Sequence, residues 1–530
     1  MKQLVYRFFV VATFVLSMCG NLPAAPTAAG IEVKSVFQTT GQGNLRDALL
    51  RMSLKGGDEE CVKFSELTVC IDETTCRNID ELQVYGTMSP EYYAEAAPAL
   101  LGVAKPKTGI VRIKADRRLA AGSFRYLWLT CKVKQDAALG EYICAEVKTL
   151  KAFAAGSKSS FDLSGSSGVQ GRGVKIFKQQ QFLFVPTTYG CRFYRIPAMT
   201  TDCNGNLVVA ADRRYDSNGD LGEHKIDVVV RRSSDGGRTW TPQQFIAVGD
   251  GQNDDTYGYG DAALATTGTG RIVCLLSAGK NNFFRGMHNI GITYSDDDGK
   301  TWTEPRELTA HRFTDAVHGL VDSLGFWSVF ATSGRGLLMP DGRIMFAANC
   351  IGQPNTYTID CYMLTSADNG ESWQLGRQCA YRACDESKLA MMNDGSLLLS
   401  VRQDGNRGFN RSDSDGESWQ QQWRTADMTG NACNADMMYY SRETDGEKDI
   451  ILHTLINDRE RKNLTLYRST DKGMTWHELM NIQPGGAAYS TMVKLPGGDV
   501  AIFYEDDSYS ADNGYHLNFI VVSREQITAK

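Results

Sequence analysis

Ser233-Ser-Asp-Gly-Gly-Arg-Thr-Trp240 is the first of five near-copies of one phrase, Ser-x-Asp-x-Gly-x-x-Trp, in this chain of 530 residues. The other four copies end at Trp302, Trp373, Trp419 and Trp476. The copy that ends at Trp419 departs from the pattern, because Ser414 stands where the other copies have Asp. Five of the eight tryptophans close a copy, so chance does not explain the recurrence, and it indicates a repeat architecture.

Each copy has the chemistry of a turn between two strands. Asp and Ser side chains hydrogen-bond to the backbone of a turn, Gly permits a positive φ, and Trp packs the turn against a sheet. The residues before the copies are strand-like, as in Ile226–Ser233 and Asn463–Ser469. Successive copies begin 46 to 71 residues apart, which suits a four-stranded sheet with long loops. Residues 176–530 are therefore expected to form a six-bladed β-propeller, in which the phrases are scaffold rather than active site.

Three further parts are expected before residue 176. Residues 1–29 have the charges, apolar run and small residues of a secretory signal peptide, which predicts a secreted or periplasmic protein; Cys19 leaves a lipid-anchored cell-surface form as the alternative. Residues 30–153 contain strand-like stretches and no copy of the phrase, which favours a β-sandwich. Carbohydrate binding and simple packing against the repeats are both open as its role. Residues 154–175 are rich in Gly and Ser and predict a linker.

Composition excludes several classes of protein. A net charge of −6 gives no indication of nucleic-acid binding, and no later segment is long and apolar enough to be transmembrane. The fourteen cysteines show no obvious disulfide framework, although a bond near Cys61, Cys70 and Cys76 stays open. The sequence contains neither CxxC pairs nor an HExxH motif, so no metal site is expected. The protein is expected to be an all-β monomer.

Tyr194-Arg195-Ile196-Pro197 opens the first repeat. Together with the phrases, it resembles the bacterial sialidases (neuraminidases), whose Arg-Ile-Pro signature is followed by repeated Asp boxes. Segments 211–237, 385–402, 461–476 and 488–498 resemble further parts of the family in the same order. The resemblance covers residues 176–530. It implies an exo-α-sialidase that removes terminal sialic acids from glycoproteins, gangliosides and sialyl-oligosaccharides, without a cofactor.

The resemblance implies an arginine triad of Arg195, Arg402 and Arg461. Sialic acid carries a carboxylate on its anomeric carbon, and guanidinium groups bind a carboxylate bidentately while staying charged. Taken singly, each arginine suits a surface or salt-bridge role; as a converging set they indicate an anionic ligand. Arg459 is the alternative to Arg461, because residues two apart in a strand share a face.

The same resemblance implies that Tyr489 is the nucleophile and Glu386 the carboxylate that activates it. A neutral phenol avoids the like-charge repulsion that a carboxylate nucleophile would meet at this anomeric carbon. With a Tyr nucleophile, sialidases are an exception to the two-carboxylate rule of glycoside hydrolysis. Outside this pattern, Tyr489 would be a packed sheet residue and Glu386 a solvated loop acid.

Asp220 matches the family's general acid/base, with Asp216 as the alternative. Arg214 and Asp261 match positions that contact the 4-hydroxyl of the sugar. Phe326 and Trp327 are candidates for aglycone contact, with core packing as the plainer role for both.

The expected mechanism retains the anomeric configuration. Two alternatives stay open: a trans-sialidase or intramolecular trans-sialidase on the same site, and a non-catalytic glycan-binding propeller.

Overall fold

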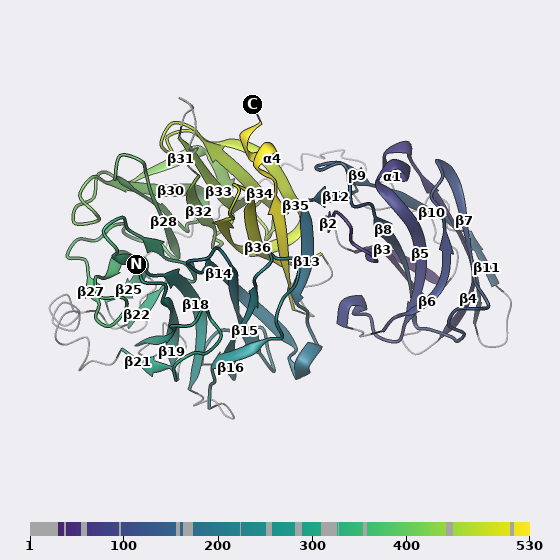
Figure 1. Ribbon diagram of the computed structural model, residues 1–530, viewed down its shortest axis with the longest axis horizontal. Coiled ribbons are helices and arrows are strands. Elements are labelled where there is room, and N and C mark those ends of the chain that lie inside the picture. The colour runs from purple at the N-terminus through teal and green to yellow at the C-terminus, as the bar shows by residue number, and fades with distance from the viewer. Residues whose placement is uncertain are drawn as a thin grey trace, which may run out of the picture.

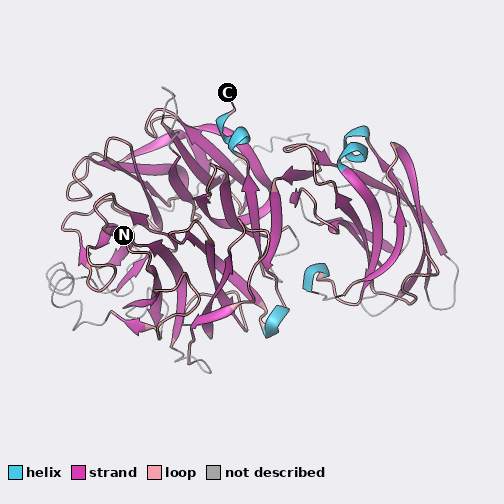
Figure 2. Cartoon of the chain, viewed as in Figure 1, coloured by secondary structure: helices cyan, strands magenta, loops and turns pink. Residues whose placement is uncertain are grey.

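The computed structural model of the protein describes residues 30–36, 39–54, 61–94, 97–154, 159–162, 173–222, 224–250, 257–280, 289–308, 326, 328–352, 358–440, 449–508 and 514–529. The expected signal peptide, with Cys19, lies outside these residues. Figure 1 shows a smaller body, coloured purple to blue, beside a larger body that runs from teal to yellow. Almost all of the regular structure is strand (Figure 2), so the prediction of an all-β chain is confirmed. Within the described ranges, no helix is long and apolar enough to cross a membrane.

Two sheets make up most of the smaller body, with strand orders β1-β3-β8-β5-β6 and β11-β10-β4-β7. These strands are β1 (Ile31–Ser35), β3 (Asp47–Leu54), β4 (Val62–Ile71), β5 (Ile79–Thr87), β6 (Ala99–Ala104), β7 (Gly109–Lys114), β8 (Tyr126–Val133), β10 (Ala145–Ala154) and β11 (Ser159–Asp162). Val84 and Leu129 of the first sheet and Leu67 and Val69 of the second belong to one buried cluster. The two sheets therefore share a hydrophobic core.

One short helix and several free thiols complete the smaller body. Helix α1 (Glu73–Asn78) begins after Asp72, whose carboxylate accepts a hydrogen bond of 2.6 Å from the Thr75 N–H and thereby caps the helix. Every cysteine in the described part of the chain is a free thiol, including the three for which a disulfide stayed open: Cys61, Cys70 and Cys76.

The expected linker, residues 154–175, contains more pairing than its composition suggests. Strand β11 returns along β10, with Phe161 opposite Leu150. Further on, β12 (Val174–Phe177) pairs with β2 (Thr39–Gly41) and with β9 (Tyr142–Ile143). Gly and Ser residues do not prevent a backbone from adding to an available sheet edge, which explains the difference. Residues 155–158 and 163–172 lie outside the described ranges.

The larger body consists of sheets formed mostly by antiparallel strands that follow one another along the chain, with β23 added parallel to β18. Four of these sheets are β14-β15-β16-β17, β18 to β21 with β23, β22 with β24 to β27, and β28-β29-β30-β31. Their strands are β14 (Phe193–Thr201), β15 (Leu207–Arg214), β16 (Ile226–Ser233), β17 (Gln244–Ala247), β18 (Gly258–Thr266), β19 (Ile272–Gly279), β20 (Asn289–Ser295), β21 (Arg306–Glu307), β22 (Ser328–Ala331), β23 (Gly334–Arg335), β24 (Leu337–Leu338), β25 (Ile344–Ile351), β26 (Asp360–Ser366), β27 (Gln374–Leu375), β28 (Ser387–Met391), β29 (Leu397–Val401), β30 (Gly405–Ser412) and β31 (Trp423–Gly430).

The last sheet joins the end of this body to its beginning. The remaining strands are β32 (Asp436–Tyr440), β33 (Ile450–Ile456), β34 (Lys462–Ser469), β35 (His477–Lys494), β36 (Val500–Asp506), β37 (His516–Val522) and β13 (Gln179–Phe184). Strand β13 pairs with β37, and Gln180 donates to the side chain of Asn518, 338 residues away, at 2.9 Å. Helix α4 (Arg524–Thr528) follows, with a capping box at Ser523. The meandering sheets and this closure are consistent with a β-propeller.

The repeated phrases form the turns that their sequence predicts. Each begins at the last residue of a strand: β16, β20, β26, β30 or β34. In the first copy, Asp235 accepts from the Thr239 N–H at 2.9 Å and from its hydroxyl at 2.6 Å, and the indole of Trp240 donates to the Gly237 carbonyl at 3.0 Å. The copies at Trp302, Trp373 and Trp476 repeat the same set of bonds.

The copy at Trp419 keeps the turn with a weaker set of bonds. The Ser414 hydroxyl accepts from the Ser418 N–H at 3.0 Å and bonds to the Ser418 hydroxyl at 2.6 Å, where an Asp would offer two charged oxygens. The Trp419 indole still reaches the Gly416 carbonyl at 3.1 Å. The Ser414 hydroxyl thus accepts in this turn the backbone hydrogen bond that an Asp carboxylate accepts in the other copies.

We predict that Ser414→Asp stabilises the protein, because a hydrogen bond to a charged acceptor is stronger than one to a hydroxyl. The free energy of unfolding should rise by about 1 kcal/mol, measured by urea denaturation with tryptophan fluorescence. Hydrogen bonds lower the pKa of Asp297, in the copy at Trp302, to about 2 against the opposing effect of burial. The gain should therefore be present above the ordinary Asp pKa and disappear as the pH falls towards 2. Ser414→Ala, the control, should be less stable than the wild type; a Ser414→Asp variant no more stable than wild type would contradict the assignment.

Candidate active site

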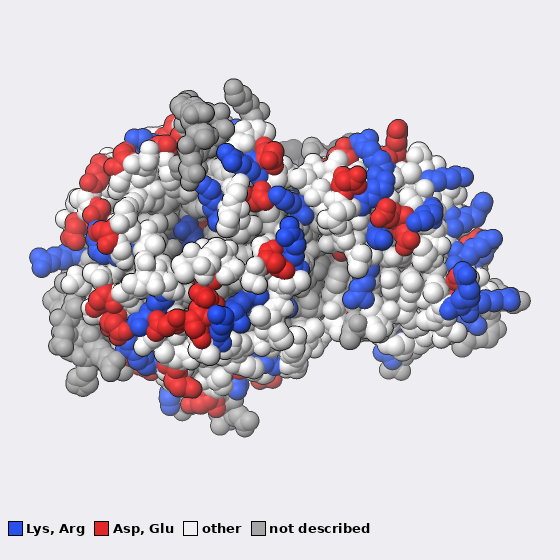
Figure 3. Space-filling view, in the orientation of Figure 1, with Lys and Arg blue, Asp and Glu red and all other residues white. Residues whose placement is uncertain are grey.

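A cavity of about 190 Å³ opens in the larger body, and side chains from several sheets line it. Figure 3 shows this body hollowed on the visible face, with cationic side chains inside the hollow. Seven residues predicted from the sequence line the cavity: Arg195, Asp220, Asp261, Glu386, Arg402, Arg461 and Tyr489. Residues up to 294 positions apart in the chain therefore meet at one place.

Arg195, on β14, is held by a carboxylate that the sequence analysis missed. Glu505 of β36 accepts from Arg195 Nε at 2.6 Å and from Nη2 at 3.3 Å. The same carboxylate accepts the backbone N–H groups of Ile196 at 2.9 Å and Tyr489 at 3.1 Å. Glu505 is fully buried, so one charged side chain fixes both an arginine and the backbone on which Tyr489 is carried. The only signal in the sequence is an acid near the end of an otherwise apolar strand.

The backbone beside Arg195 is irregular. Ile196 has a φ of +58°, which is costly for a β-branched residue. The pairing of β14 with β15 shifts between Arg195 and Ala198, as at a β-bulge, and a bulge re-aims neighbouring side chains. The Ile196 N–H donates to Glu505, so the strained segment is anchored by the carboxylate that binds Arg195.

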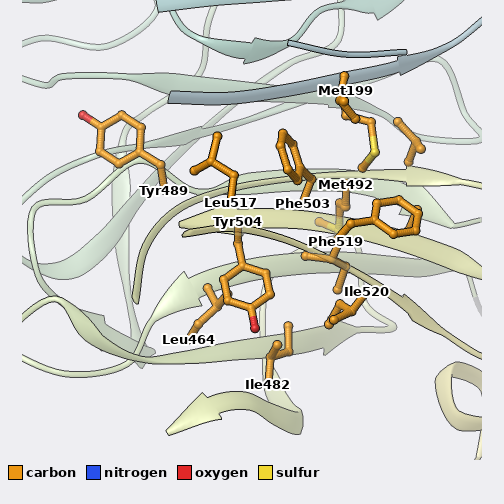
Figure 4. Packing of buried hydrophobic residues seen from close by; sticks show 14 of the residues in the cluster. Met199, Leu464, Ile482, Tyr489, Met492, Phe503, Tyr504, Leu517, Phe519 and Ile520 are labelled. Atoms are coloured by element: carbon orange, nitrogen blue, oxygen red, sulfur yellow. The ribbon is translucent and has the colours of Figure 1, made fainter. Parts of the chain in front are cut away.

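Tyr489 lies at the margin of the core, with its hydroxyl directed away from the labelled apolar side chains (Figure 4). Arg402 Nη1 donates to the Tyr489 hydroxyl at 2.7 Å and also to Glu386 Oε2. Arg402 Nε lies 3.3 Å from Asp385 Oδ2. One guanidinium nitrogen thus holds the phenol and the Glu386 carboxylate side by side.

Three guanidinium groups surround the ring of Tyr489. The Cζ atoms of Arg195, Arg461 and Arg402 lie 5.4, 5.5 and 5.9 Å from its centroid. Arg461 is half-buried and lines the cavity, whereas Arg459 is exposed and does not line it. The structure therefore places Arg461, rather than its alternative, with the other two arginines.

Asp220 lies at the mouth of the cavity, and its side chain is 72% exposed. Arg214 Nη1 donates to Asp220 at 3.0 Å and to the carbonyls of Asn218 and Gly219, while Nη2 donates to Asp212 at 2.8 Å. Arg214 is only 1% exposed and does not line the cavity. In the empty site the Arg214 guanidinium holds the loop that carries Asp220, and its contact with a sugar hydroxyl stays a prediction.

Of the remaining candidates, Asp261 lines the cavity, whereas Asp216 and Phe326 do not. Asp261 has a φ of +53°, and its backbone N–H donates to Asp212 Oδ1 at 3.0 Å. Asp216 is exposed and does not line the cavity. Phe326 packs edge-on against Tyr362 in a hydrophobic core, and Trp327 lies outside the described residues. The apolar wall of the cavity comes instead from residues that the sequence analysis did not name: Leu221, Phe330 and Ile359.

Charge sets the protonation states of the site. Burial raises the pKa of Tyr489 well above its usual value. Burial also acts to raise the pKa of Glu386, but Arg402 and Lys388 outweigh it and lower that pKa. Desolvation of Asp220 is likewise outweighed, by Arg214 and Arg195, so its pKa is lowered. Before a ligand binds, the proton is therefore on the phenol, and both carboxylates are ionised.

Two more carboxyl groups of the site have raised pKa values. Burial raises the pKa of Asp212 to about 6, and burial together with Asp212 and Asp220 raises that of Asp261 well above its usual value. The described residues include no group of three or more His, Cys, Asp or Glu side chains placed to hold a metal ion.

Comparison with known proteins gives concordant matches. The BNR repeat-like domain family matches residues 217–502. A sialidase from Bacteroides fragilis (strain YCH46) is 25% identical over 437 residues, which cover 76% of this chain and 74% of that protein. The Hadza microbial sialidase Hz136 has a TM-score of 0.67 at 22% identity, covering 94% of this chain and 100% of that one. The intramolecular trans-sialidase from Ruminococcus gnavus, in complex with oseltamivir carboxylate, has a TM-score of 0.51 at 17% identity, covering 64% and 96%. These two structural likenesses show a shared fold.

We predict that Glu505→Gln strongly destabilises the protein, because the variant keeps the side-chain shape but leaves Arg195 buried without its counter-charge. Removing one partner of a buried pair costs about 3 kcal/mol or more, which urea denaturation would measure. The control is Glu460→Gln, in an exposed pair with Lys462, which should leave the midpoint unchanged. Equal midpoints for the two variants would show that Glu505 does not anchor the site.

Proposed function

We propose that this chain, which belongs to the BNR repeat-like domain family, is an exo-α-sialidase of the bacterial sialidase family and hydrolyses terminal α-linked sialic acids with retention of configuration. The observation that carries this proposal is the convergence of three guanidinium groups on the ring of Tyr489, whose hydroxyl shares Arg402 Nη1 with Glu386. Its substrates are glycoproteins, gangliosides and oligosaccharides that end in sialic acid. The reaction uses the chain's own residues.

We propose a domain organisation to match. The smaller body (residues 30–153) is a β-sandwich, residues 154–175 connect it to the rest, and residues 176–530 form a six-bladed propeller. The last blade would combine the end of β35 with β36, β37 and β13, which are hydrogen-bonded in that order. Residues 1–29 act as a signal peptide, so the enzyme works in the periplasm or outside the cell. It works there as a monomer.

The arginines leave a place for a carboxylate. Arg195 is paired with Glu505, and Arg402 with Glu386 and Asp385. In the part of the chain that the structure describes, ion pairs with carboxylates are formed by Arg195 and Arg402 but not by Arg461. The positive charge of Arg461 thus lacks a paired carboxylate. The carboxylate on the anomeric carbon of sialic acid supplies this negative charge. Guanidinium groups suit this task because they bind carboxylates bidentately.

Tyr489 and Glu386 then carry the first step. The Tyr489 oxygen attacks the anomeric carbon and its proton passes to Glu386, while the bond to the aglycone oxygen breaks and that oxygen takes a proton from Asp220. In the second step a water attacks the anomeric carbon and gives its proton to Asp220. The bond to Tyr489 breaks, and Glu386 returns the proton to the phenolate. Two displacements at one carbon retain its configuration.

The acid role of Asp220 depends on the substrate. In the empty site its pKa is lowered by Arg214 and Arg195, against desolvation, yet a general acid must arrive protonated. Binding of the sialic acid carboxylate neutralises part of the arginine charge and so raises this pKa. The same change makes Glu386 a stronger base. The exposed position of Asp220 lets it exchange protons with solvent.

The deciding experiment is incubation of the protein with α2,3- and α2,6-sialyllactose, with products followed by NMR. Free α-sialic acid as the first product would support a retaining hydrolase and report the linkage preference. Transfer to added lactose, or release of an anhydro sugar, would assign the chain to trans-sialidases or intramolecular trans-sialidases. Binding without release would make it a glycan-binding propeller.

We predict that Tyr489→Phe lowers kcat on sialyllactose by about 10²- to 10⁴-fold, because the variant lacks the attacking oxygen. Binding of sialic acid, measured by calorimetry, should persist because the arginines remain. The control is Tyr440→Phe, which removes a buried hydroxyl that donates to the Gly498 carbonyl; neither residue lines the cavity. Full activity in Tyr489→Phe would overturn the nucleophile assignment.

We predict that Asp220→Asn distinguishes substrates by their leaving groups. On sialyllactose, kcat/KM should fall by about 10²- to 10⁴-fold, because the alcohol needs a proton to depart. On 4-nitrophenyl sialoside the fall should be much smaller, because nitrophenolate leaves unprotonated. Asp216→Asn, the control, should behave like the wild type on both substrates; the reverse pattern would identify Asp216 as the acid.

A further inference from the structure

Lys388 is a buried cation beneath the active site. It stands two residues after Glu386, on β28, and is 2% exposed. Its ammonium donates to the backbone carbonyl of Ser333. A Cβ at Gly334, where φ is +107°, would lie 3.3 Å from Lys388 Cε and 3.4 Å from Nζ. The neighbouring backbone is therefore shaped around this side chain.

Two carboxylates interact with the ammonium of Lys388: Glu386 and Asp436. Asp436, on β32, is fully buried and accepts the N–H groups of Met437 and Met492, each at 2.8 Å. Asp436 also accepts from the Thr491 hydroxyl at 3.2 Å, and Arg335 Nε lies 3.5 Å from it. Asp436 thus offsets charge on Lys388 without occupying the cavity, and neither residue lines it.

Ser333 connects Lys388 to Glu386. While its carbonyl accepts from Lys388, its hydroxyl donates to Glu386 Oε1 at 3.1 Å. Asn434 Nδ2 donates to the same hydroxyl oxygen at 2.9 Å, which directs the hydroxyl proton towards Glu386. Glu386 therefore has one oxygen fixed from the side of Lys388 and the other by Arg402.

We propose that Lys388 is a positioning residue of the reaction: acting through Ser333 and through its charge, it holds Glu386 ionised and oriented to take the proton of Tyr489. The proposal rests on the proposed function, because it assigns Glu386 the role of base. Lys388 itself touches neither the cavity nor the phenol.

Several charged or titratable groups interact with Glu386 from the surrounding strands: Arg402, Lys388, Arg407, Asp385, Asp261, Tyr489 and Cys433. Of the cations, Arg402 faces the ligand, so its charge is shared with the substrate carboxylate. Lys388 is shielded from the ligand and keeps its effect on Glu386 after binding. Burial lowers the pKa of Lys388 to about 8, so the ammonium is charged at neutral pH.

Removal of Lys388 raises the pKa of Glu386, because a cation beside a carboxylate favours its ionised form. A base that must be ionised then fails at a higher pH, and the acid limb of the rate profile moves upward. A residue that only supported the fold would lower activity at all pH values alike.

The test is the pH dependence of kcat/KM for Lys388→Met on 4-nitrophenyl sialoside, whose departure needs no proton from Asp220. We expect the acid limb to move up by about one pH unit or more, with sialic acid affinity within about threefold of wild type. Lys175→Met is the matched control: Lys175 is also buried and donates to a backbone carbonyl, that of Asn481, away from the site. Its profile should superimpose on that of the wild type.

Ser333→Ala provides the second variant, because it removes the hydroxyl but keeps the carbonyl that binds Lys388. We expect a smaller upward shift of the acid limb, and this variant decides the matter if Lys388→Met does not fold. Unshifted acid limbs in the folded variants would overturn the proposal. Failure of the wild type to release sialic acid at all would instead overturn the proposed function, so the two failures are distinguishable.

Discussion

The site depends on one constraint: the positive charges of three guanidinium groups around a buried phenol must be balanced by negative charge. Unpaired, these charges would repel one another and bear a large desolvation cost. Glu505 removes much of that cost, since it binds Arg195 and the N–H groups of Ile196 and Tyr489. The nucleophile's backbone and the first arginine are thus fixed relative to each other by a single carboxylate, before any ligand enters.

The fold separates this costly chemistry from the elements that stabilise it. The repeated phrases lie at turns after strands such as β16 and β34, where Trp240 packs against Phe519 with ring centroids 5.1 Å apart. The cavity is lined from other places: Arg195 at the start of β14, Glu386 just before β28 and Tyr489 within β35. The degenerate turn at Ser414 can therefore lose bonds without disturbing the charged centre.

What the sequence could predict follows the range of the interactions. The turns were predictable, because the partners of Asp235 lie within eight residues. Most residues of the cavity were predicted from the resemblance to bacterial sialidases. Glu505 was not accessible in this way, because its pairing with Arg195 spans 310 residues. The pairing of Arg214 with Asp212 could have been predicted from spacing, because alternation along β15 puts both side chains on the same face. The strand at Ser159–Asp162 was missed because edge pairing depends on a partner more than on composition.

The pairing of β13 with β37 also governs when the larger body can form. Gln180 and Asn518 meet across 338 residues, so the body cannot close until almost the whole chain has left the ribosome. Contacts of such long range make folding slow, and until they form the edge of β36 offers unpaired backbone to other chains. The last strand therefore makes assembly of the body nearly all-or-none, and chaperones would have most to protect in the interval before it arrives.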